Sequence, residues 1–175
     1  DSDGRQEIVV AAMDRHLYAW HDDGTAVTGF PLLIADPATV ASVDPTTHRI
    51  TYVDGVKVAD GGELTATPAI GDLDGDGKPD FAVGAPHGHA AGATSLDTGW
   101  VSGRVYLFLG KDVATTGEAT PATRATLLSR PGKTLHYGSF LTPFARSGAR
   151  LLVGAPTASR QDGAVFVEDL AVVIP

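Results

Sequence analysis

The sequence contains no cysteine, which excludes disulfide bridges and thiolate chemistry. Asparagine is absent as well, so there is no acceptor for N-linked glycosylation. Lys and Arg number 13 against 21 Asp and Glu, for a net charge of −8, and no basic cluster suits a nucleic acid. No apolar run approaches the roughly 18 residues that span a bilayer. We therefore expect neither nucleic-acid binding nor membrane insertion.

What the sequence has in quantity is turn-forming residues, with 21 Gly and 11 Pro among 175 residues. Apolar residues alternate over short runs between these turns, and few segments show a helical period. The pattern predicts an all-β protein of many short strands. Because the chain starts at Asp1 without an initiator Met or a signal peptide, it is expected to be a processed product or a piece of a larger protein.

The most informative stretch is residues 72–80, which read DLDGDGKPD and run directly into the apolar strand pattern FAVGAP. Its four carboxylates are those of Asp72, Asp74, Asp76 and Asp80. Without a counter-ion these groups would repel one another, whereas Ca²⁺ favours six to eight oxygen ligands in an acidic, flexible loop. Gly77 permits a sharp turn, and Lys78 would contribute its backbone carbonyl. The spacing predicts a calcium loop that leads into a strand.

The stretch has two other interpretations, an EF-hand and a turn without a metal. An EF-hand begins in the same way, but it needs a Glu at position twelve and flanking helices. Position twelve here is Val83, inside an apolar run, so the EF-hand is rejected on both counts. The alternative is a solvated Asp/Gly turn that binds no metal.

The acidic loop and the strand that follows it have related copies elsewhere in the chain. Residues 1–12 align with residues 74–85 at an offset of 73, which gives a second, truncated acidic loop. Its candidate ligands form a weaker, partial metal site that comprises Asp1, Asp3, Arg5 and Glu7. Residues 151–156 align with residues 81–86 at an offset of 70. At that offset the acidic positions are taken by Thr142, Phe144, Arg146 and Arg150, so no ion is expected in the third repeat.

These repeats predict three units: a partial repeat at residues 1–60, a complete one at 61–130, and a third with a degenerate loop at 131–175. A compact hairpin is predicted around Asp54, between residues 49–53 and 56–58. Residues 111–123 are predicted to be a polar loop without a chemical role.

Tyr137-Gly138-Ser139-Phe140, the Gly-Ala-Pro runs at 84–86 and 154–156, and the acidic loop together resemble FG-GAP repeats. Such repeats are the blades of integrin α-like β-propellers, and residues 17–31 resemble bacterial members of the group. The resemblance implies four-stranded antiparallel blades with calcium loops between first and second strands. With about two and a half repeats, it implies an incomplete ring or part of a larger propeller. The missing partners would be further blades of the parent chain or other copies.

In this family, ligands bind loops on the opposite face of the propeller. The matching segment is the long loop at residues 86–103, whose candidate ligand-binding residues are His87, His89, Asp97 and Trp100. Long loops without structure of their own are often functional, and an exposed Trp is a common anchor. Packing of Trp100 onto its own blade is an equally reasonable alternative.

No catalytic motif accompanies these features: the sequence has no nucleophile elbow, no P-loop and no His-Glu-x-x-His. We expect a non-enzymatic, calcium-binding, extracellular module that binds a protein or carbohydrate. Two alternatives remain at this point. The chain could be the non-catalytic propeller part of a secreted hydrolase or lyase, or a structural module that assembles with its own copies.

Overall fold

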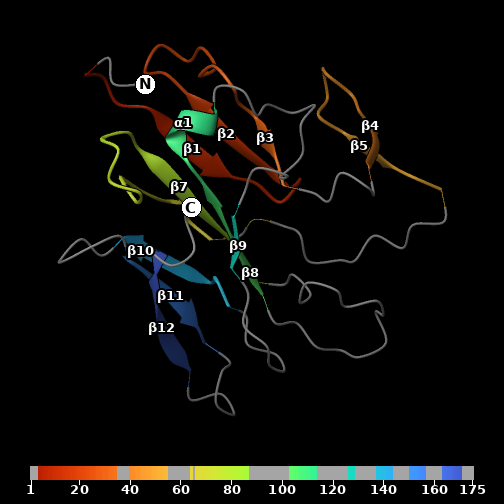
Figure 1. The fold of residues 1–175 in the computed structure, drawn as a ribbon. Coiled ribbons are helices and arrows are strands. Elements are labelled where there is room, and N and C mark those ends of the chain that lie inside the picture. The colour runs from red at the N-terminus through yellow and green to blue at the C-terminus, as the bar shows by residue number, and fades with distance from the viewer. Residues whose placement is uncertain are drawn as a thin grey trace.

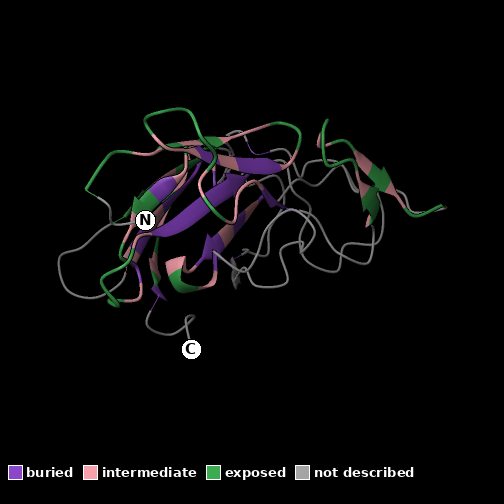
Figure 2. Ribbon diagram, turned by 90° about the horizontal axis from the view of Figure 1, so that it is seen from above, coloured by how far each residue is buried: buried purple, intermediate pink, exposed green. Residues whose placement is uncertain are grey.

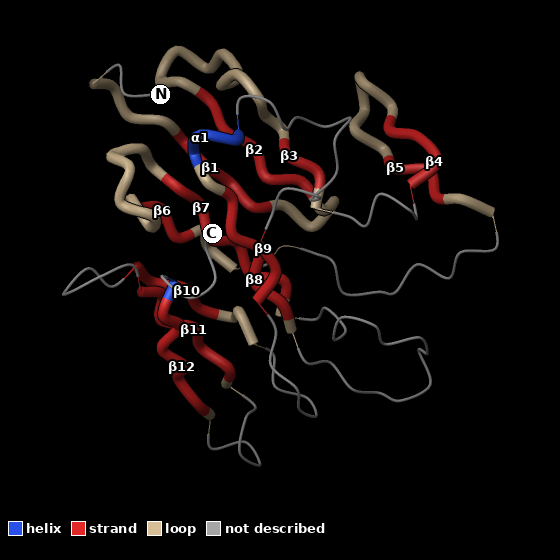
Figure 3. The backbone as a smooth tube through the Cα atoms, in the orientation of Figure 1, coloured by secondary structure: helices blue, strands red, loops and turns tan. Residues whose placement is uncertain are grey.

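Apart from one helical turn, the structure is built from short antiparallel strands (Figures 1 and 3). It is a computed structural model that describes residues 4–34, 40–54, 64, 66–86, 103–113, 126–128, 137–143, 150–156 and 163–170. No helix in these ranges is long and apolar enough to cross a membrane.

Three sheets follow one another along the chain, and we call them blades one, two and three. Blade one has the order β1 (Ile8–Ala11), β2 (His16–Trp20), β3 (Leu32–Leu33). Blade two has the order β6 (Ala69–Gly71), β7 (Asp80–Ala85), β8 (Arg104–Phe108), β9 (Thr126–Leu128), and the short helix α1 (Gly110–Val113) follows β8. Blade three has the order β10 (Phe140–Pro143), β11 (Arg150–Ala155), β12 (Ala164–Asp169). The predicted all-β class with antiparallel blades is confirmed, and the described residues do not close into a ring.

A separate hairpin, β4 (Val40–Val43) and β5 (Ile50–Tyr52), follows blade one. Its turn is organised by Asp44, whose Oδ1 accepts the backbone N–H groups of Thr46 and Thr47, each at 2.8 Å. This pairing was not predicted, because residues 49–53 were expected to pair across Asp54 with residues 56–58. Residues 56–58, the other half of that predicted hairpin, lie outside the described residues.

Strand register tests the repeat alignment residue by residue. Ala155 pairs with Ala164 in blade three as Ala85 pairs with Arg104 in blade two, so the alignment of the second and third strands holds. The first strand does not follow the offset of 70. Leu152, the equivalent of Ala82, pairs with Thr142, whereas Ala82 itself pairs with Ala69.

The placement of Thr142 at the position of Asp72 was therefore wrong. Thr142 lies within β10 and corresponds to Ala69, an offset of 142 − 69 = 73 rather than 70. The connection between the first two strands is thus 73 − 70 = 3 residues shorter in blade three than in blade two. Of the other residues aligned with the loop, Phe144 and Arg146 lie outside the described residues.

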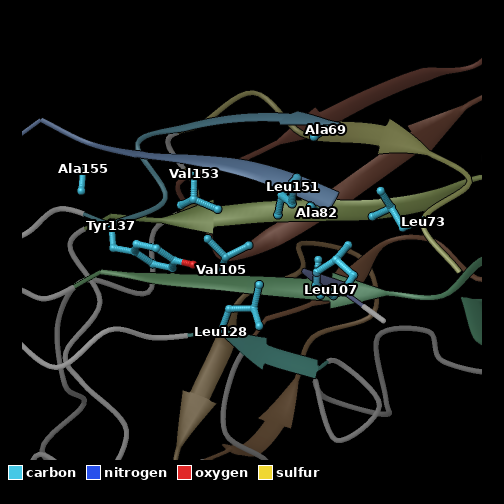
Figure 4. Close-up of a cluster of buried hydrophobic side chains, with 11 residues drawn as sticks. Ala69, Leu73, Ala82, Val105, Leu107, Leu128, Tyr137, Leu151, Val153 and Ala155 are labelled. Atoms are coloured by element: carbon cyan, nitrogen blue, oxygen red, sulfur yellow. The ribbon is translucent and has the colours of Figure 1, made fainter. Parts of the chain in front are cut away.

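Blade two is the centre of the stack, because its second strand is covered on both faces. All six residues of β7 are buried. Phe81 and Val83 belong to a cluster with Leu17 and Leu32 of blade one. Ala82 belongs to a second cluster with the blade-three residues Leu151 and Val153 and with Val105 and Leu107 of β8 (Figure 4). Figure 2 shows this buried strand lying between more exposed segments. From Phe81 to Ala85 the strand has no polar side chain, as burial on both faces requires.

Close packing between blades two and three explains the glycines of the repeat motifs. A Cβ atom on Gly84 would lie 1.9 Å from the carbonyl oxygen of Gly138, so the two backbones approach as only glycine permits. Gly138 itself has φ +92°, a left-handed conformation that disfavours other residues. The preceding Tyr137 is fully buried, and its hydroxyl donates a hydrogen bond of 2.7 Å to Glu168.

Substituting Gly84→Ala should lower the free energy of unfolding by about 1–3 kcal/mol, because the methyl group must displace backbone rather than a flexible side chain. Gly71→Ala is the matched control in the same blade: its Cβ would make an ordinary contact of 3.4 Å with Pro143, and the expected change is below about 0.5 kcal/mol. Urea denaturation measures both values. Equal effects of the two substitutions would contradict the packing described for Gly84.

Candidate metal centre

The acidic loop connects β6 to β7 at one end of blade two. Its last carboxylate, Asp80, is the first residue of β7 and is only 1% exposed. An isolated buried carboxylate is costly, so it must be paired or hydrogen-bonded. Its Oδ2 accepts the backbone N–H groups of Leu73 at 2.6 Å and Asp74 at 3.1 Å. Its Oδ1 accepts the N–H of Gly110 at 2.8 Å. Asp80 therefore ties the loop to β7 and to the start of α1.

The remaining carboxylates fold the loop around themselves. Asp72 accepts the N–H groups of Gly75 at 2.7 Å and Gly77 at 3.0 Å, one on each oxygen. Both glycines have positive φ, +82° and +85°, so the loop's two tight turns depend on residues without a Cβ. The Oδ1 atom of Asp76 accepts the N–H of Lys78 at 2.8 Å.

Three carboxylates of the loop converge. One oxygen atom of each lies within 4.8 Å of the other two, and the residues are Asp72, Asp74 and Asp80. Such a cluster fits a hard divalent cation, which favours carboxylate oxygens from a loop of this kind. Burial decreases across the group, from buried Asp80 through half-buried Asp74 to exposed Asp72, so one side is open to solvent. Asp76 is not in the cluster, and its role and that of the Lys78 carbonyl remain predictions.

A cation of the protein already contacts this cluster. Lys111 of α1 places its Nζ 3.0 Å from Oδ2 of Asp74. Residues 111–123 were predicted to be a polar loop without a chemical role, but residues 111–113 belong to α1, whose first residues contact the acidic loop. Gly110 lies so close that a Cβ there would be 2.3 Å from the carbonyl oxygen of Pro79. Only the fold brings these residues together, since Lys111 and Asp74 are separated by 37 positions.

The electrostatics of the carboxylates differ because their surroundings differ. Burial raises the pKa of Asp80 above its usual range, although the N–H groups of Gly110, Leu73 and Asp74 act in the opposite direction. The hydrogen bond from Lys111 lowers the pKa of Asp74, and the same contact raises the pKa of the Lys111 ammonium. A second positive charge in the cluster would favour the ionised form of all three carboxylates.

The weaker site predicted near the N-terminus is described only in part. Arg5 donates to Oδ2 of Asp22 from Nε at 3.0 Å and from Nη2 at 2.7 Å. Glu7 Oε1 lies 3.9 Å from Nδ1 of His21. Arg5 and Glu7 also line a cavity of about 370 Å³ between blades one and two, whose other walls include Phe30 and Phe81. Asp1 and Asp3 lie outside the described residues, so metal binding at this position stays a prediction.

The predicted ligand-binding residues also fall outside the described part of the chain. They are His87, His89, Asp97 and Trp100. The described residues on either side are Pro86, directly after β7, and Gly103, directly before β8. Pro86 lies at the end of β7 opposite Asp80.

Comparison with known families assigns one segment of the chain. Residues 65–108, which include β6, the acidic loop, β7 and β8, match the family model of the FG-GAP repeat. The chain therefore contains an FG-GAP repeat, and the family recognised from the sequence is confirmed. Comparison with curated proteins finds no match. FG-GAP repeats are generally non-catalytic modules of β-propellers and are typically extracellular.

Replacing the buried carboxylate, Asp80→Asn, should lower the free energy of unfolding in chelator by about 1–3 kcal/mol, because an amide NH₂ would oppose at least one backbone donor. The matched control is Asp54→Asn, which removes a charge from an exposed turn. Urea denaturation in the presence of EDTA measures both. An unchanged midpoint for Asp80→Asn would show that Asp80 does not organise the loop.

Removing the protein's own cation, Lys111→Gln, should tighten Ca²⁺ binding several-fold, because the ammonium competes with the ion for Asp74. The same variant should melt at a lower temperature in chelator, since the acidic cluster loses its partner. Arg49→Gln, an exposed charge on the β4–β5 hairpin, is the control and should change neither quantity. Isothermal titration calorimetry checks the affinity, and weaker Ca²⁺ binding by Lys111→Gln would contradict the prediction.

Proposed function

We propose that the chain is a calcium-binding, extracellular β-propeller module whose task is to bind a protein or a carbohydrate rather than to catalyse a reaction. The observation that carries the calcium assignment is the convergence of Asp72, Asp74 and Asp80 within an FG-GAP repeat. The three clustered groups are all carboxylates, a donor type that suits Ca²⁺ better than a transition metal.

The role of the ion would be structural. The acidic loop joins the first two strands of the central blade, and Asp80 lies at the start of the strand that both neighbouring blades cover. Ca²⁺ would neutralise the carboxylates there and hold the loop in one conformation. Recognition is assigned to the loop at the opposite end of β7, which carries His87, His89, Asp97 and Trp100.

Calcium should therefore raise the stability of the folded chain. At a free Ca²⁺ concentration of about one hundred times the Kd, linkage predicts a gain of roughly 2.7 kcal/mol. For a chain of this size the melting temperature would rise by about 5–10 °C. Asp74→Asn should abolish most of the rise, because it removes a charged ligand from the cluster. Differential scanning calorimetry with Ca²⁺, with Mg²⁺ and with EDTA provides the measurement.

The control for this experiment is again Asp54→Asn, which should keep the full response to Ca²⁺ because it lies outside the cluster. Identical melting curves with Ca²⁺ and EDTA for the unsubstituted chain would refute the calcium assignment.

Recognition is tested separately from stability. Screening the chain against arrays of glycans and extracellular-matrix proteins should reveal ligands whose binding Trp100→Ala weakens while the calcium response is kept. Ligands that bind both forms equally would remove Trp100 from the proposed binding surface.

A further inference from the structure

The acidic cluster already holds a positive charge that the chain itself supplies. The Lys111 ammonium lies 3.0 Å from Oδ2 of Asp74, one of the three carboxylates that converge in the loop. The other oxygen of this carboxylate, Oδ1, accepts the N–H of Asp76 at 3.1 Å. Both oxygens of Asp74 therefore have partners, and one of those partners is a cation.

The Lys111 side chain can leave this position without uncovering the core. It is 43% exposed, whereas the Asp74 side chain is 9% exposed, so the contact joins an exposed ammonium to a largely buried carboxylate. A lysine ammonium is strongly hydrated and sits on a flexible stem. Ion pairs with one exposed member stabilise a fold only weakly, so the release of the ammonium to solvent costs little.

The backbone that carries Lys111 is fixed by contacts that do not involve its side chain. In the preceding residue, the N–H of Gly110 donates to Oδ1 of Asp80 at 2.8 Å, and Gly110 lies against the carbonyl of Pro79. Two residues after Lys111, Val113 is 6% exposed within the apolar cluster that blades one and two share. Because α1 is held at both ends, a change at the cluster is met by the Lys111 side chain alone.

A metal ion and the ammonium would compete for the same carboxylate. A divalent ion held by the three clustered groups would share Asp74 with Lys111, and two cations on one ligand repel each other. The divalent ion carries the larger charge and can use all three carboxylates, so the ammonium is the cation that gives way.

We propose that Ca²⁺ and the Lys111 ammonium occupy this site alternately: the ammonium neutralises Asp74 in the metal-free chain, and metal binding releases it to solvent while the backbone of α1 stays in place. This inference rests on the calcium site proposed above and adds how that site is regulated. Because the ion must displace a bound cation, the carboxylates bind Ca²⁺ less tightly than they would without Lys111. The site therefore exchanges cations as the Ca²⁺ concentration changes, and the loop keeps a counter-charge in both states.

Acetylation of lysine side chains, resolved residue by residue, tests the release. An amine held in an ion pair is a poorer nucleophile than one free in solvent, so brief treatment with N-hydroxysuccinimidyl acetate distinguishes the two states. Mass spectrometry separates Lys111 from Lys57 and Lys133, whose rates serve as the reference. Relative to these rates, acetylation of Lys111 should be slow in EDTA and several-fold faster in saturating Ca²⁺.

Asp74→Asn supplies the rate of a released side chain. Without the carboxylate, Lys111 should react at the fast rate both in EDTA and in Ca²⁺. Isothermal titration calorimetry of the unsubstituted chain separates the exchange from the calcium site itself. Heat of Ca²⁺ binding with an unchanged Lys111 rate would overturn the exchange and leave the calcium site standing. The absence of both the heat and the rate change would remove the calcium site and the exchange together.

Hydrogen exchange tests the second half of the proposal, that the backbone of α1 stays in place. The N–H of Asp112 donates to the carbonyl of Leu109 at 2.9 Å, so its exchange rate reports whether the turn is intact. The rate should be no faster in Ca²⁺ than in EDTA. Faster exchange in Ca²⁺ would show that the turn unwinds, and would overturn an exchange confined to the side chain.

Discussion

The buried carboxylate of Asp80 is the constraint on which the rest of the metal centre depends. It opens β7, which the neighbouring blades cover on both faces, so it cannot keep a hydration shell. Backbone N–H groups from the loop and from the start of α1 replace the lost water, and in doing so they fix the loop's path. Asp72 and Asp74 are thereby brought close to Asp80, which creates the negative charge that a cation must offset.

The proposed function places stability and recognition in different parts of the chain. Calcium, in this account, acts on the turn between the first two strands of the central blade. In blade three the sequence between β10 and β11 contains no Asp or Glu, and this connection is three residues shorter than in blade two, yet the blade packs on blade two through Tyr137 and Gly138. The blade fold therefore does not need the acidic loop. The ion would stabilise the central blade, and recognition is proposed for His87, His89, Asp97 and Trp100.

The strands, the acidic loop and the family could be predicted from the sequence because each depends on local signals: apolar alternation, carboxylate spacing and glycine position. Three features could not. The register of β10 depends on the length of the preceding connection, and a single offset cannot reveal a change of three residues. Lys111 reaches Asp74 only through tertiary packing. The turn of the β4–β5 hairpin depends on hydrogen bonds to the Asp44 side chain, whereas the Asp54-Gly55 pair is the more usual sequence signal for a tight turn.

Hydrogen exchange with and without Ca²⁺ tests the central claim most directly, because it reports the amides that the carboxylates hold. The account predicts that Ca²⁺ slows exchange at Leu73, Asp74, Gly75, Gly77 and Gly110, while amides of β12 in blade three change little. Uniform protection across all three blades, or no change at these five amides, would contradict the assignment of Asp72–Asp80 as a calcium site that stabilises only its own loop.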